Sequence, residues 1–355
     1  MVIRDWSSDV CSSDLLNKIH KPIRIGFVEK SVADIFKEII DYPKQTIPKK
    51  HLVIGLGPAG LANALKMAEY GFTVEAIDAN EQLGGTVYNL VPDFRFDKSV
   101  LNDIRRKFDL LNIKIHFNTY VGRDVLLKDL IHKFDSVFIA DGLGLPSSVD
   151  LQIDHVHVFY AQDLLNTNIY SMSDLKTLLG DRIYIIGLGN VAIDMARTLR
   201  RLDKEVHIVY RRTINDAPAG KFEIQHAIEE GVVIHELLGP VALRLQDKIK
   251  ILNCEETCLV KSPDGSRDLV QSIPNSDVSF EIDDLVFATG QKTSDVLFHG
   301  SDVIQTPEIS PFATNYPHIF VGGDRINKNK RIVDAMVTGI EVAERIVKGL
   351  YEIYR

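Results

Sequence analysis

The 355-residue sequence has few cysteines and little tryptophan, with three Cys and one Trp. Three cysteines do not make the disulfide framework of a small secreted domain. No run of about 18 uncharged apolar residues occurs, so we expect no membrane-spanning segment. Positive charge is not in excess either, because 41 Lys and Arg stand against 49 Asp and Glu and leave a net charge of −8. These absences exclude a basic face for nucleic acid or anionic lipid, and they favour small polar ligands.

The first residues differ from the rest of the chain in composition. Residues 5 to 15 read DWSSDVCSSDL and resemble the translation of a common sequencing adapter. We interpret residues 1 to 15 as an adapter-like artefact that carries Trp6 and Cys11. The alternative is a natural disordered leader rich in Ser and Asp. On the adapter interpretation, the natural sequence upstream of residue 16 is missing.

The remaining chain alternates apolar runs with amphipathic stretches, and its length suggests about two domains. Residues 16 to 47 are typical of a linker with one amphipathic helix, at 31 to 40. After this linker, strands and helices alternate, which predicts a parallel sheet covered by helices. The first copy of this plan is expected to have strands at 51–55, 72–77, 113–117 and 136–140 and helices at 58–70, 98–110 and 124–133.

A second copy of the same plan begins at Arg182. Short alternating strands are expected between 241 and 285, with a hairpin turn at 262–265, and a last helix at 332–349. The second copy is expected to have strands at 182–186, 205–210 and 232–237 and helices at 190–201 and 220–230.

A glycine-rich turn, Gly55-Leu56-Gly57-Pro58-Ala59-Gly60, joins the first predicted strand to the first predicted helix. In such a fingerprint the first glycine permits a tight turn, the second lets the backbone approach a pyrophosphate, and the third lets helix and strand pack closely. Asp78 ends the next strand, where a carboxylate can accept the hydroxyls of an adenosine ribose and repel a 2′-phosphate. The turn predicts FAD or NAD and disfavours NADP. The alternatives are a structural glycine turn and a solvated Asp78.

A second turn, Gly187-Leu188-Gly189-Asn190-Val191-Ala192, repeats the fingerprint with alanine in third position. The strand after it ends in Arg211 and Arg212, where the first copy has an acid. Guanidinium groups bind phosphate in a bidentate manner, so this turn predicts NADPH in preference to NADH. The alternative is that both arginines face solvent. Hydride transfer between stacked cofactors needs no general acid or base, so we expect no catalytic side chain. No His, Asp or Cys cluster has metal-ligand spacing, so we expect no metal site.

Six motifs occur in order: VIGLGPAGLANAL, GGTVYNLVPDFRFDK, IIGLGNVAIDMARTLRRL, VYRRTINDAPA, FATGQ, and IFVGGD followed by RIVDAMVTGIEVAERI. With them, the chain from about Pro22 to Ile353 resembles the glutamate synthase small subunit and its relatives. These include the flavoprotein part of dihydropyrimidine dehydrogenase and the flavoprotein subunit of ferredoxin-dependent NADP oxidoreductases. The resemblance implies an α/β fold of two Rossmann-like dinucleotide-binding domains, with an NADPH domain (152–285) inserted into a discontinuous FAD domain (48–151 and 286–355).

The resemblance also implies which residues hold the two cofactors. The FAD contacts would come from the first turn, the ribose acid, nearby loops and the last helix: Gly55, Gly57, Pro58, Ala59, Gly60, Asp78, Gly85, Thr86, Arg95, Val121, Gly323, Asp324 and Val333. The NADPH contacts would come from the second turn, the two arginines and the crossing between domains: Gly189, Asn190, Val191, Arg211, Arg212, Ala288, Thr289 and Gly290.

Three positions depart from the family pattern. Asp78 replaces a usual Glu, Leu90 replaces a Gly in the loop over the flavin, and Asp141 replaces the Thr of an ATG motif. A basic run at residues 328 to 331 would meet an acidic electron-transfer partner or form a solvated loop.

The resemblance implies a cytoplasmic, NADPH-dependent flavoprotein oxidoreductase. It would pass hydride from NADPH to FAD, and electrons on to iron–sulfur centres or to a partner protein like the glutamate synthase large subunit or a ferredoxin. Family members commonly carry an iron–sulfur domain before the segment matched at Pro22, so we expect such clusters in the missing N-terminal region. The alternatives are a stand-alone ferredoxin–NADP reductase and a nucleotide-binding scaffold or sensor subunit. We interpret Cys254 and Cys258 as strand residues, because their CxxxC spacing does not match a redox CxxC pair.

Overall fold

The computed structural model describes residues 46–353 except 148, 150, 155 and 264–266. The adapter-like residues and the helix predicted at 31–40 lie outside the described residues. The chain forms two compact units. The described part of the first unit runs to Tyr88, continues over Asp93–Leu145 and resumes at Lys292, whereas the second unit consists of Asn89–Pro92 and Pro146–Gln291. The second unit is therefore inserted into the first in sequence.

Five parallel strands form the sheet of the first unit, in the order β16-β4-β1-β2-β3. Strands β1 and β4 are buried on both faces, as is usual for a parallel sheet. Ile54 of β1 is in register with Ile77 of β2 and Ile139 of β4, so the turns after these strands meet at one sheet edge. The strands are β1 (Lys50–Ile54), β2 (Thr73–Ile77), β3 (Lys114–His116), β4 (Ser136–Ile139) and β16 (Ile319–Val321).

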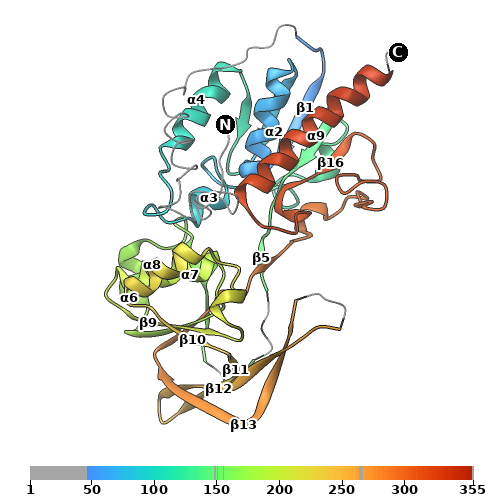
Figure 1. The fold of residues 1–355 in the computed structure, drawn as a ribbon. Helices are drawn as coiled ribbons and strands as arrows, with labels where there is room; N and C mark the ends of the chain where they lie inside the picture. Colours follow the sequence, from blue (N-terminus) through green and yellow to red (C-terminus); the bar gives the residue numbers. More distant parts are fainter. Residues whose placement is uncertain (1–45, 148, 150, 155, 264–266, 354–355) are drawn as a thin grey trace, which may run out of the picture. The chain divides into compact units, whose positions relative to one another are not determined.

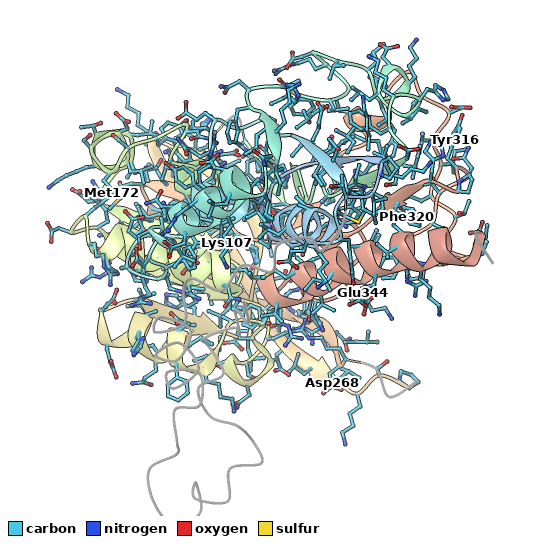
Figure 2. All side chains as sticks on the ribbon, turned by 90° about the horizontal axis from the view of Figure 1, so that it is seen from above. Lys107, Met172, Asp268, Tyr316, Phe320 and Glu344 are labelled. Atoms are coloured by element: carbon cyan, nitrogen blue, oxygen red, sulfur yellow. The ribbon has the colours of Figure 1, made fainter. Side chains whose placement is uncertain are left out.

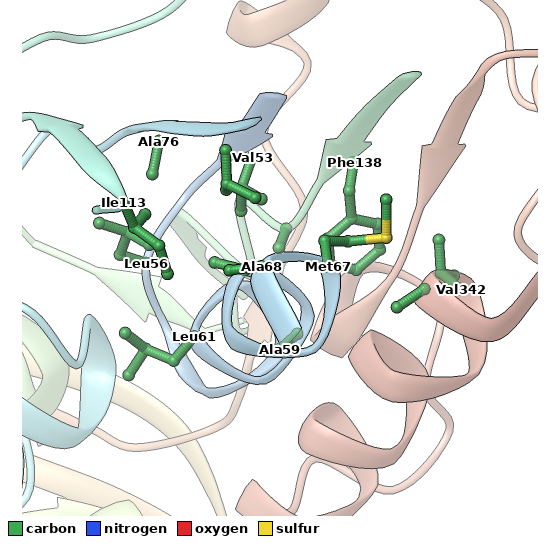
Figure 3. Packing of buried hydrophobic residues seen from close by; sticks show 14 of the residues in the cluster. Val53, Leu56, Ala59, Leu61, Met67, Ala68, Ala76, Ile113, Phe138 and Val342 are labelled. Carbon is green, nitrogen blue, oxygen red and sulfur yellow. The ribbon is translucent and has the colours of Figure 1, made fainter. Parts of the chain in front are cut away.

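Helices pack on this sheet around α2, and α9 lies beside α2 (Figure 1). Figure 3 shows side chains of the buried cluster gathered around α2, among them Val53, Met67 and Phe138. A Cβ on Gly339 would lie 2.2 Å from the carbonyl oxygen of Ala59, so glycine permits the close contact of α9 with α2. The helices and 3-10 turns are α2 (Pro58–Glu69), α3 (Thr86–Asn89), α4 (Val100–Leu110), η3 (Leu127–Asp129), η5 (Val296–Phe298), η6 (Gly323–Arg325) and α9 (Ile332–Ile353).

The helix predicted at 124–133 is wrong, because the segment contains only the 3-10 turn η3. Leu127, Leu130 and Ile131 are nevertheless buried against the other face of the sheet. The helical spacing of these three residues is real, but one tight turn is enough to bury them.

The second unit contains a five-stranded parallel sheet of order β10-β9-β8-β14-β7 and a four-stranded sheet of order β13-β12-β11-β6. Helices cover one face of the parallel sheet, where Ile185 and Ile208 are buried. Tyr184, Leu243 and Leu252 are buried between the two sheets. The parallel strands are β7 (Phe159–Tyr160), β8 (Arg182–Ile186), β9 (Glu205–Tyr210), β10 (Val233–Glu236) and β14 (Asp284–Phe287), and the helices are α5 (Ala161–Leu165), α6 (Met172–Leu178), α7 (Asn190–Arg200), η4 (Ile214–Asp216) and α8 (Lys221–Glu229).

The antiparallel strands of the second unit are longer than predicted. β12 (Ile249–Val260) has 12 residues and β13 (Leu269–Ile282) has 14, and the two pair with each other. β12 also pairs with β11 (Leu238–Gln246), and β6 (Gln152–Ile153) adds to β11 in parallel. The pairing register shifts between Pro240 and Ala242 and between Glu255 and Thr257, where β-bulges take up the extra residues. The strands therefore continue through sequence that favours turns. The hairpin turn predicted at 262–265 lies partly outside the described residues.

In both parallel sheets four strands follow the same order: β3-β2-β1-β4 in the first unit corresponds to β10-β9-β8-β14 in the second, as in a nucleotide-binding half of a doubly wound sheet. The fifth strand differs, because β16 comes last in the chain in the first sheet and β7 comes first in the second. The prediction of two Rossmann-like domains, one inserted into the other, is confirmed.

Short strands β5 (Leu145–Pro146) and β15 (Gln291–Lys292) pair where the chain passes between the units. Within the described residues, no helix combines the length and hydropathy needed to cross a membrane.

A buried histidine ties four elements of the first unit together. His51 Nδ1 lies 2.7 Å from Ser136 Oγ, and Nε2 lies 2.7 Å from Asn63 Oδ1. Asn63 Nδ2 then donates to the Gly339 carbonyl over 2.9 Å. A neutral ring satisfies both contacts when Nε2 donates to Asn63 Oδ1 and Nδ1 accepts from the Ser136 hydroxyl. Burial accordingly lowers the pKa of His51 from 6.5 to about 4, although its hydrogen bond with Asn63 opposes the shift.

The buried His51 makes folding stability depend on pH. The unfolded chain takes up a proton near pH 6.5 and the folded chain only near pH 4, so the contribution of His51 is complete above pH 6.5 and falls by about 3 kcal/mol as the pH drops to 4. Urea unfolding at several pH values should show a steeper loss of stability in the wild type than in His51→Gln. The exposed His132→Gln is the control and should keep the wild-type slope. Equal slopes in wild type and His51→Gln would contradict the assignment.

Candidate functional site

A glycine turn follows the central strand of each parallel sheet, β1 in the first unit and β8 in the second. The backbone itself requires glycine at the first position of each turn, because φ is +93° at Gly55 and +114° at Gly187. A Cβ on Gly55 would lie 2.4 Å from the carbonyl oxygen of Ala140, and one on Gly187 would lie 2.6 Å from that of Ala288. These glycines let the chain turn against the end of the neighbouring strand.

The middle glycine of each turn has no such explanation in the fold. Gly57 and Gly189 have φ values of −69° and −92°, which any residue adopts. A Cβ on either would meet nothing within 4 Å. Each is the N-cap residue of a helix, α2 or α7, that has no side-chain cap. Open space therefore lies beside uncapped N–H donors, as binding of an anion at a helix N-terminus requires.

The third position of each turn is closely packed. A Cβ on Gly60 would lie 1.8 Å from the carbonyl oxygen of Gly55, so a larger residue would separate α2 from β1. Ala192 takes this position in the second turn and is fully buried. In both turns the first and third positions serve the fold, and only the middle position is left for a ligand.

Asp78 directly follows β2, and its carboxylate is hydrogen-bonded to the backbone of the first glycine turn. Its Oδ2 accepts a hydrogen bond from the Leu56 N–H over 2.5 Å, and its Oδ1 accepts from the backbone and side-chain nitrogens of Asn80 over 2.7 and 2.9 Å. Burial raises the pKa of Asp78, and these hydrogen bonds oppose the rise. Since each carboxylate oxygen has two acceptor sites, Oδ2 keeps one for a further donor. Asp78 therefore has a structural role that the sequence did not indicate.

Two loops of the first unit lie against the first turn. A Cβ on Gly85 would be 3.0 Å from Gly57 Cα, and one on Gly323 would be 3.0 Å from Ala59 Cβ. The Gly323 N–H donates to Thr338 Oγ1 over 2.9 Å, which fixes this loop to α9. The structure thus brings together predicted residues from three distant segments of the sequence.

Polar atoms without partners follow Gly323. Asp324 Oδ1 and Asn327 Nδ2 are buried and have no hydrogen-bond partner within the described part of the chain. Burial raises the pKa of Asp324, Lys330 opposes the rise and Asp334 adds to it. An unpartnered acceptor and an unpartnered donor next to the turn fit a ligand rich in hydroxyl groups, as the ribityl chain of FAD is. The residues present therefore fit the cofactor that the sequence predicts.

Asp141, a departure from the family pattern, has a partner in the loop after β16. Its two carboxylate oxygens accept from Arg325 Nε over 2.8 Å and from Nη2 over 2.6 Å. The Arg325 side chain is only 4% exposed, also donates to the Ser294 carbonyl and lies over the Phe298 ring. This bidentate pair joins the segment after β4 to η6, the turn that contains Asp324.

The arginines predicted in the second unit lie at the end of β9. Arg211 is exposed, and its carbonyl accepts from Thr257 Oγ1 over 3.0 Å. Arg212 is half-buried, and its Nη1 donates to the Asp268 carbonyl over 2.7 Å. Both residues therefore contact the sheet formed by β11 to β13, which supports the backbone at this position.

The other predicted residues occupy several environments. Arg95 is half-buried, and Val121 is a core residue of the cluster that also contains Ile54. The residues Ala288, Thr289 and Gly290 follow β14, with the Ala288 carbonyl beside Gly187. The remaining predicted residues belong to the first turns of α2, α3, α7 and α9: Pro58, Thr86, Asn190, Val191 and Val333.

Sequence reasoning missed Arg325, Asn327 and Arg267. Arg325 is separated from Asp141 by 184 residues, and no local pattern indicates that pairing. Arg267 lies two residues before the long strand β13, and its contact with Tyr210 spans 57 residues. The one available signal was the unusual Asp141, because a buried acid needs a partner of opposite charge.

Comparison with known proteins identifies the class. The family model for pyridine nucleotide-disulphide oxidoreductases matches residues 49–341. The chain belongs to this family, which confirms the class of protein predicted from the sequence.

Several relatives are similar over most of this chain. The subunit beta of NADP(+)-dependent formate dehydrogenase from Moorella thermoacetica is 31% identical over 309 residues, which are 85% of this chain and 44% of the relative. The small chain of glutamate synthase [NADPH] from Escherichia coli K12 is 27% identical over 365 residues, covering 94% of this chain and 76% of the relative. The chain spans only 44% and 54% of the formate dehydrogenase subunit and of the putative oxidoreductase UacF of Escherichia coli K12.

A solved structure supports the fold independently. FprA of Mycobacterium tuberculosis, in complex with NADPH, superposes with a TM-score of 0.68 at 16% identity, over 86% of this chain and 87% of FprA. At this level of identity the likeness concerns the fold alone.

The buried Asp141–Arg325 pair generates a stability prediction. Asp141→Asn leaves the buried Arg325 guanidinium without its bidentate partner, so the free energy of unfolding should fall by about 3 kcal/mol. Asp109→Asn is the control, because it removes the acid of an exposed pair with Arg105 and should cost less than about 0.5 kcal/mol. Thermal or urea unfolding measures both variants. Similar stability losses in both would show that the buried pair does not hold this segment.

Proposed function

We propose that the chain is an FAD-dependent NADPH oxidoreductase. The observation that carries the proposal is the middle glycine of each turn, which neither backbone conformation nor packing explains. When bound, FAD would accept hydride from NADPH and release electrons one at a time. The residues of this chain bind and orient the two nucleotides, and no side chain is needed to move a proton.

The first turn is the proposed FAD site. The N–H groups at the start of α2 would face the pyrophosphate, with Gly57 leaving room for its approach. Asp78 would accept from the adenosine ribose through its remaining acceptor site. Asp324 and Asn327 would hydrogen-bond the ribityl chain with the atoms that now lack partners. The Asp141–Arg325 pair would hold the loop that carries Asp324.

The second turn is the proposed NADPH site. Gly189 leaves the N-terminus of α7 open for a pyrophosphate, and the exposed Arg211, just after β9, would lie beside the adenosine ribose. A guanidinium favours the 2′-phosphate that distinguishes NADPH from NADH. This charge supports NADPH rather than NADH as the electron donor.

We further propose that the electrons leave to iron–sulfur centres or to a partner subunit. The relatives named above include a subunit of formate dehydrogenase and a chain of glutamate synthase. Their names support a chain that works within a larger redox assembly. We place any iron–sulfur centres upstream of the region described here.

A flavin spectrum tests the proposed function. The purified chain, loaded with FAD and freed of excess, should show the visible flavin band, and NADPH under anaerobic conditions should bleach it at a lower concentration than NADH. The reason is that only NADPH carries the phosphate that the arginines favour. A chain that takes up no FAD would favour a scaffold or a sensor. Bound FAD that NADPH does not bleach would also contradict the proposal.

Substitutions of the middle glycines separate the two sites. Gly57→Val should abolish FAD retention, and Gly189→Val should abolish bleaching by NADPH while FAD stays bound, because the added Cβ enters the open space beside the helix N-terminus. The unfolding free energy of the apoprotein should change by less than about 1 kcal/mol in both. Gly60→Ala is the contrasting control and should unfold the apoprotein, since its Cβ meets the Gly55 carbonyl. Full FAD retention by Gly57→Val would refute the first site.

A further inference from the structure

The β12–β13 hairpin brings an unassigned arginine to the end of β9. Arg267 Nη2 donates to Tyr210 Oη over 3.0 Å and also to the Asp216 carbonyl. The next residue, Asp268, is labelled in Figure 2, and its carbonyl accepts from Arg212. Residues 267 and 268 therefore fasten the start of β13 to the segment 210–216.

This segment contains the proposed recognition point for the adenosine ribose. Tyr210, to which Arg267 is bonded, is the last residue of β9 and directly precedes Arg211. In a doubly wound sheet, the residues after this strand lie beside the ribose of a bound dinucleotide. Arg267 thus contacts the segment that, under the proposed function, would distinguish NADPH from NADH.

The three arginines at this point are not equivalent. Arg212 is half-buried, and its Nη1 is committed to the Asp268 carbonyl. Arg211 is exposed, and its guanidinium has no hydrogen-bond or ion-pair partner within the described residues. Arg267 is also exposed, and within those residues only its Nη2 is engaged, by two neutral acceptors. Arg211 and Arg267 therefore keep N–H donors and positive charge for an anion, whereas Arg212 mainly positions the hairpin.

The Asp216 carboxylate does not form an ion pair with the Arg267 guanidinium. The Asp216 carboxylate accepts from Thr213 Oγ1 over 2.6 Å and from the Thr213 N–H over 3.3 Å, which closes the turn around η4. Arg267 contacts the carbonyl of Asp216, not its carboxylate. Its guanidinium therefore remains available to a phosphate.

We propose that Arg267 is a specificity-determining residue of the second dinucleotide site, and that it and Arg211 bind the 2′-phosphate of NADPH from two sides. The inference rests on the proposed function and extends it to a residue outside the fingerprint. It makes the hairpin part of the recognition site. The chemistry recognised is a phosphate monoester on the 2′-oxygen of an adenosine, bound by two guanidinium forks.

A titration with fragments of the nucleotide tests this proposal without any turnover. The probes are 2′,5′-ADP, which carries the 2′-phosphate, and 5′-AMP, which lacks it. Arg267→Gln should weaken binding of 2′,5′-ADP by about tenfold to a hundredfold, the usual effect of losing a hydrogen bond to a charged group. Binding of 5′-AMP should change less than about twofold, because its contacts do not include Arg267. Arg267→Lys keeps the charge without the fork, so it should recover part of the loss.

Arg244→Gln is the matched control. Arg244 is an exposed arginine of β11 in the same unit, so its loss changes the net charge equally and should leave both affinities unchanged. Equal weakening of both probes by Arg267→Gln would assign the residue to folding of the hairpin, and unchanged binding of 2′,5′-ADP would remove it from the site. A wild-type chain that prefers 5′-AMP would instead overturn the proposed NADPH site itself, so the two failures are distinguishable.

Discussion

Close packing of backbone against backbone at the two glycine turns is the constraint on which the rest of the structure depends. Gly55 turns against the carbonyl of Ala140, and Gly187 turns against that of Ala288. Because the strands end in register, each turn delivers a helix N-terminus to the edge of a parallel sheet. The helix presents its first N–H groups there without a side-chain cap. The fold therefore has two uncapped helix N-termini of the same kind, and both can bind a dinucleotide pyrophosphate.

The first and second glycine turns differ in the charged groups around them. Asp78 closes the first turn and is almost fully buried, so its carboxylate acts at short range through hydrogen bonds. The second turn has exposed arginines from two segments of the chain, which act on a phosphate through charge and fork geometry. Under the proposed function, this contrast assigns FAD to one site and NADPH to the other. A single chain can then carry donor and acceptor nucleotides without mixing them.

Much of the fold follows from the sequence because its signals are local. The strand before Gly55, the helix after it and Asp78 at the end of the next strand all fall within one β-α-β segment, and the structure has these elements within one or two residues of the predicted bounds. The helix predicted at 124–133 failed because apolar spacing alone does not distinguish a helix from a 3-10 turn that buries the same residues. The long hairpin strands were underestimated because bulges carry pairing through turn-like sequence.

The site was predictable only in its local part. The glycines are recognisable because spacing alone defines them, and their roles as ligand contacts stay predictions. Arg325 and Arg267 could not be found, since each acts on residues that are distant in sequence and close only after folding. Asp141 was noticed as unusual, yet its meaning depends on a partner that no periodicity reveals. Such long-range polar contacts can be recognised only in the folded structure.

The central claim is that one chain holds two different adenine dinucleotides at separate turns. The most direct measurement is the binding stoichiometry of FAD and NADP⁺ on the same sample, determined by titration of the FAD-loaded chain with NADP⁺ followed by quantification of both nucleotides. The account predicts one FAD and one NADP⁺ per chain at saturation, with no FAD displaced. Displacement of FAD by NADP⁺, with one nucleotide in total per chain, would contradict it.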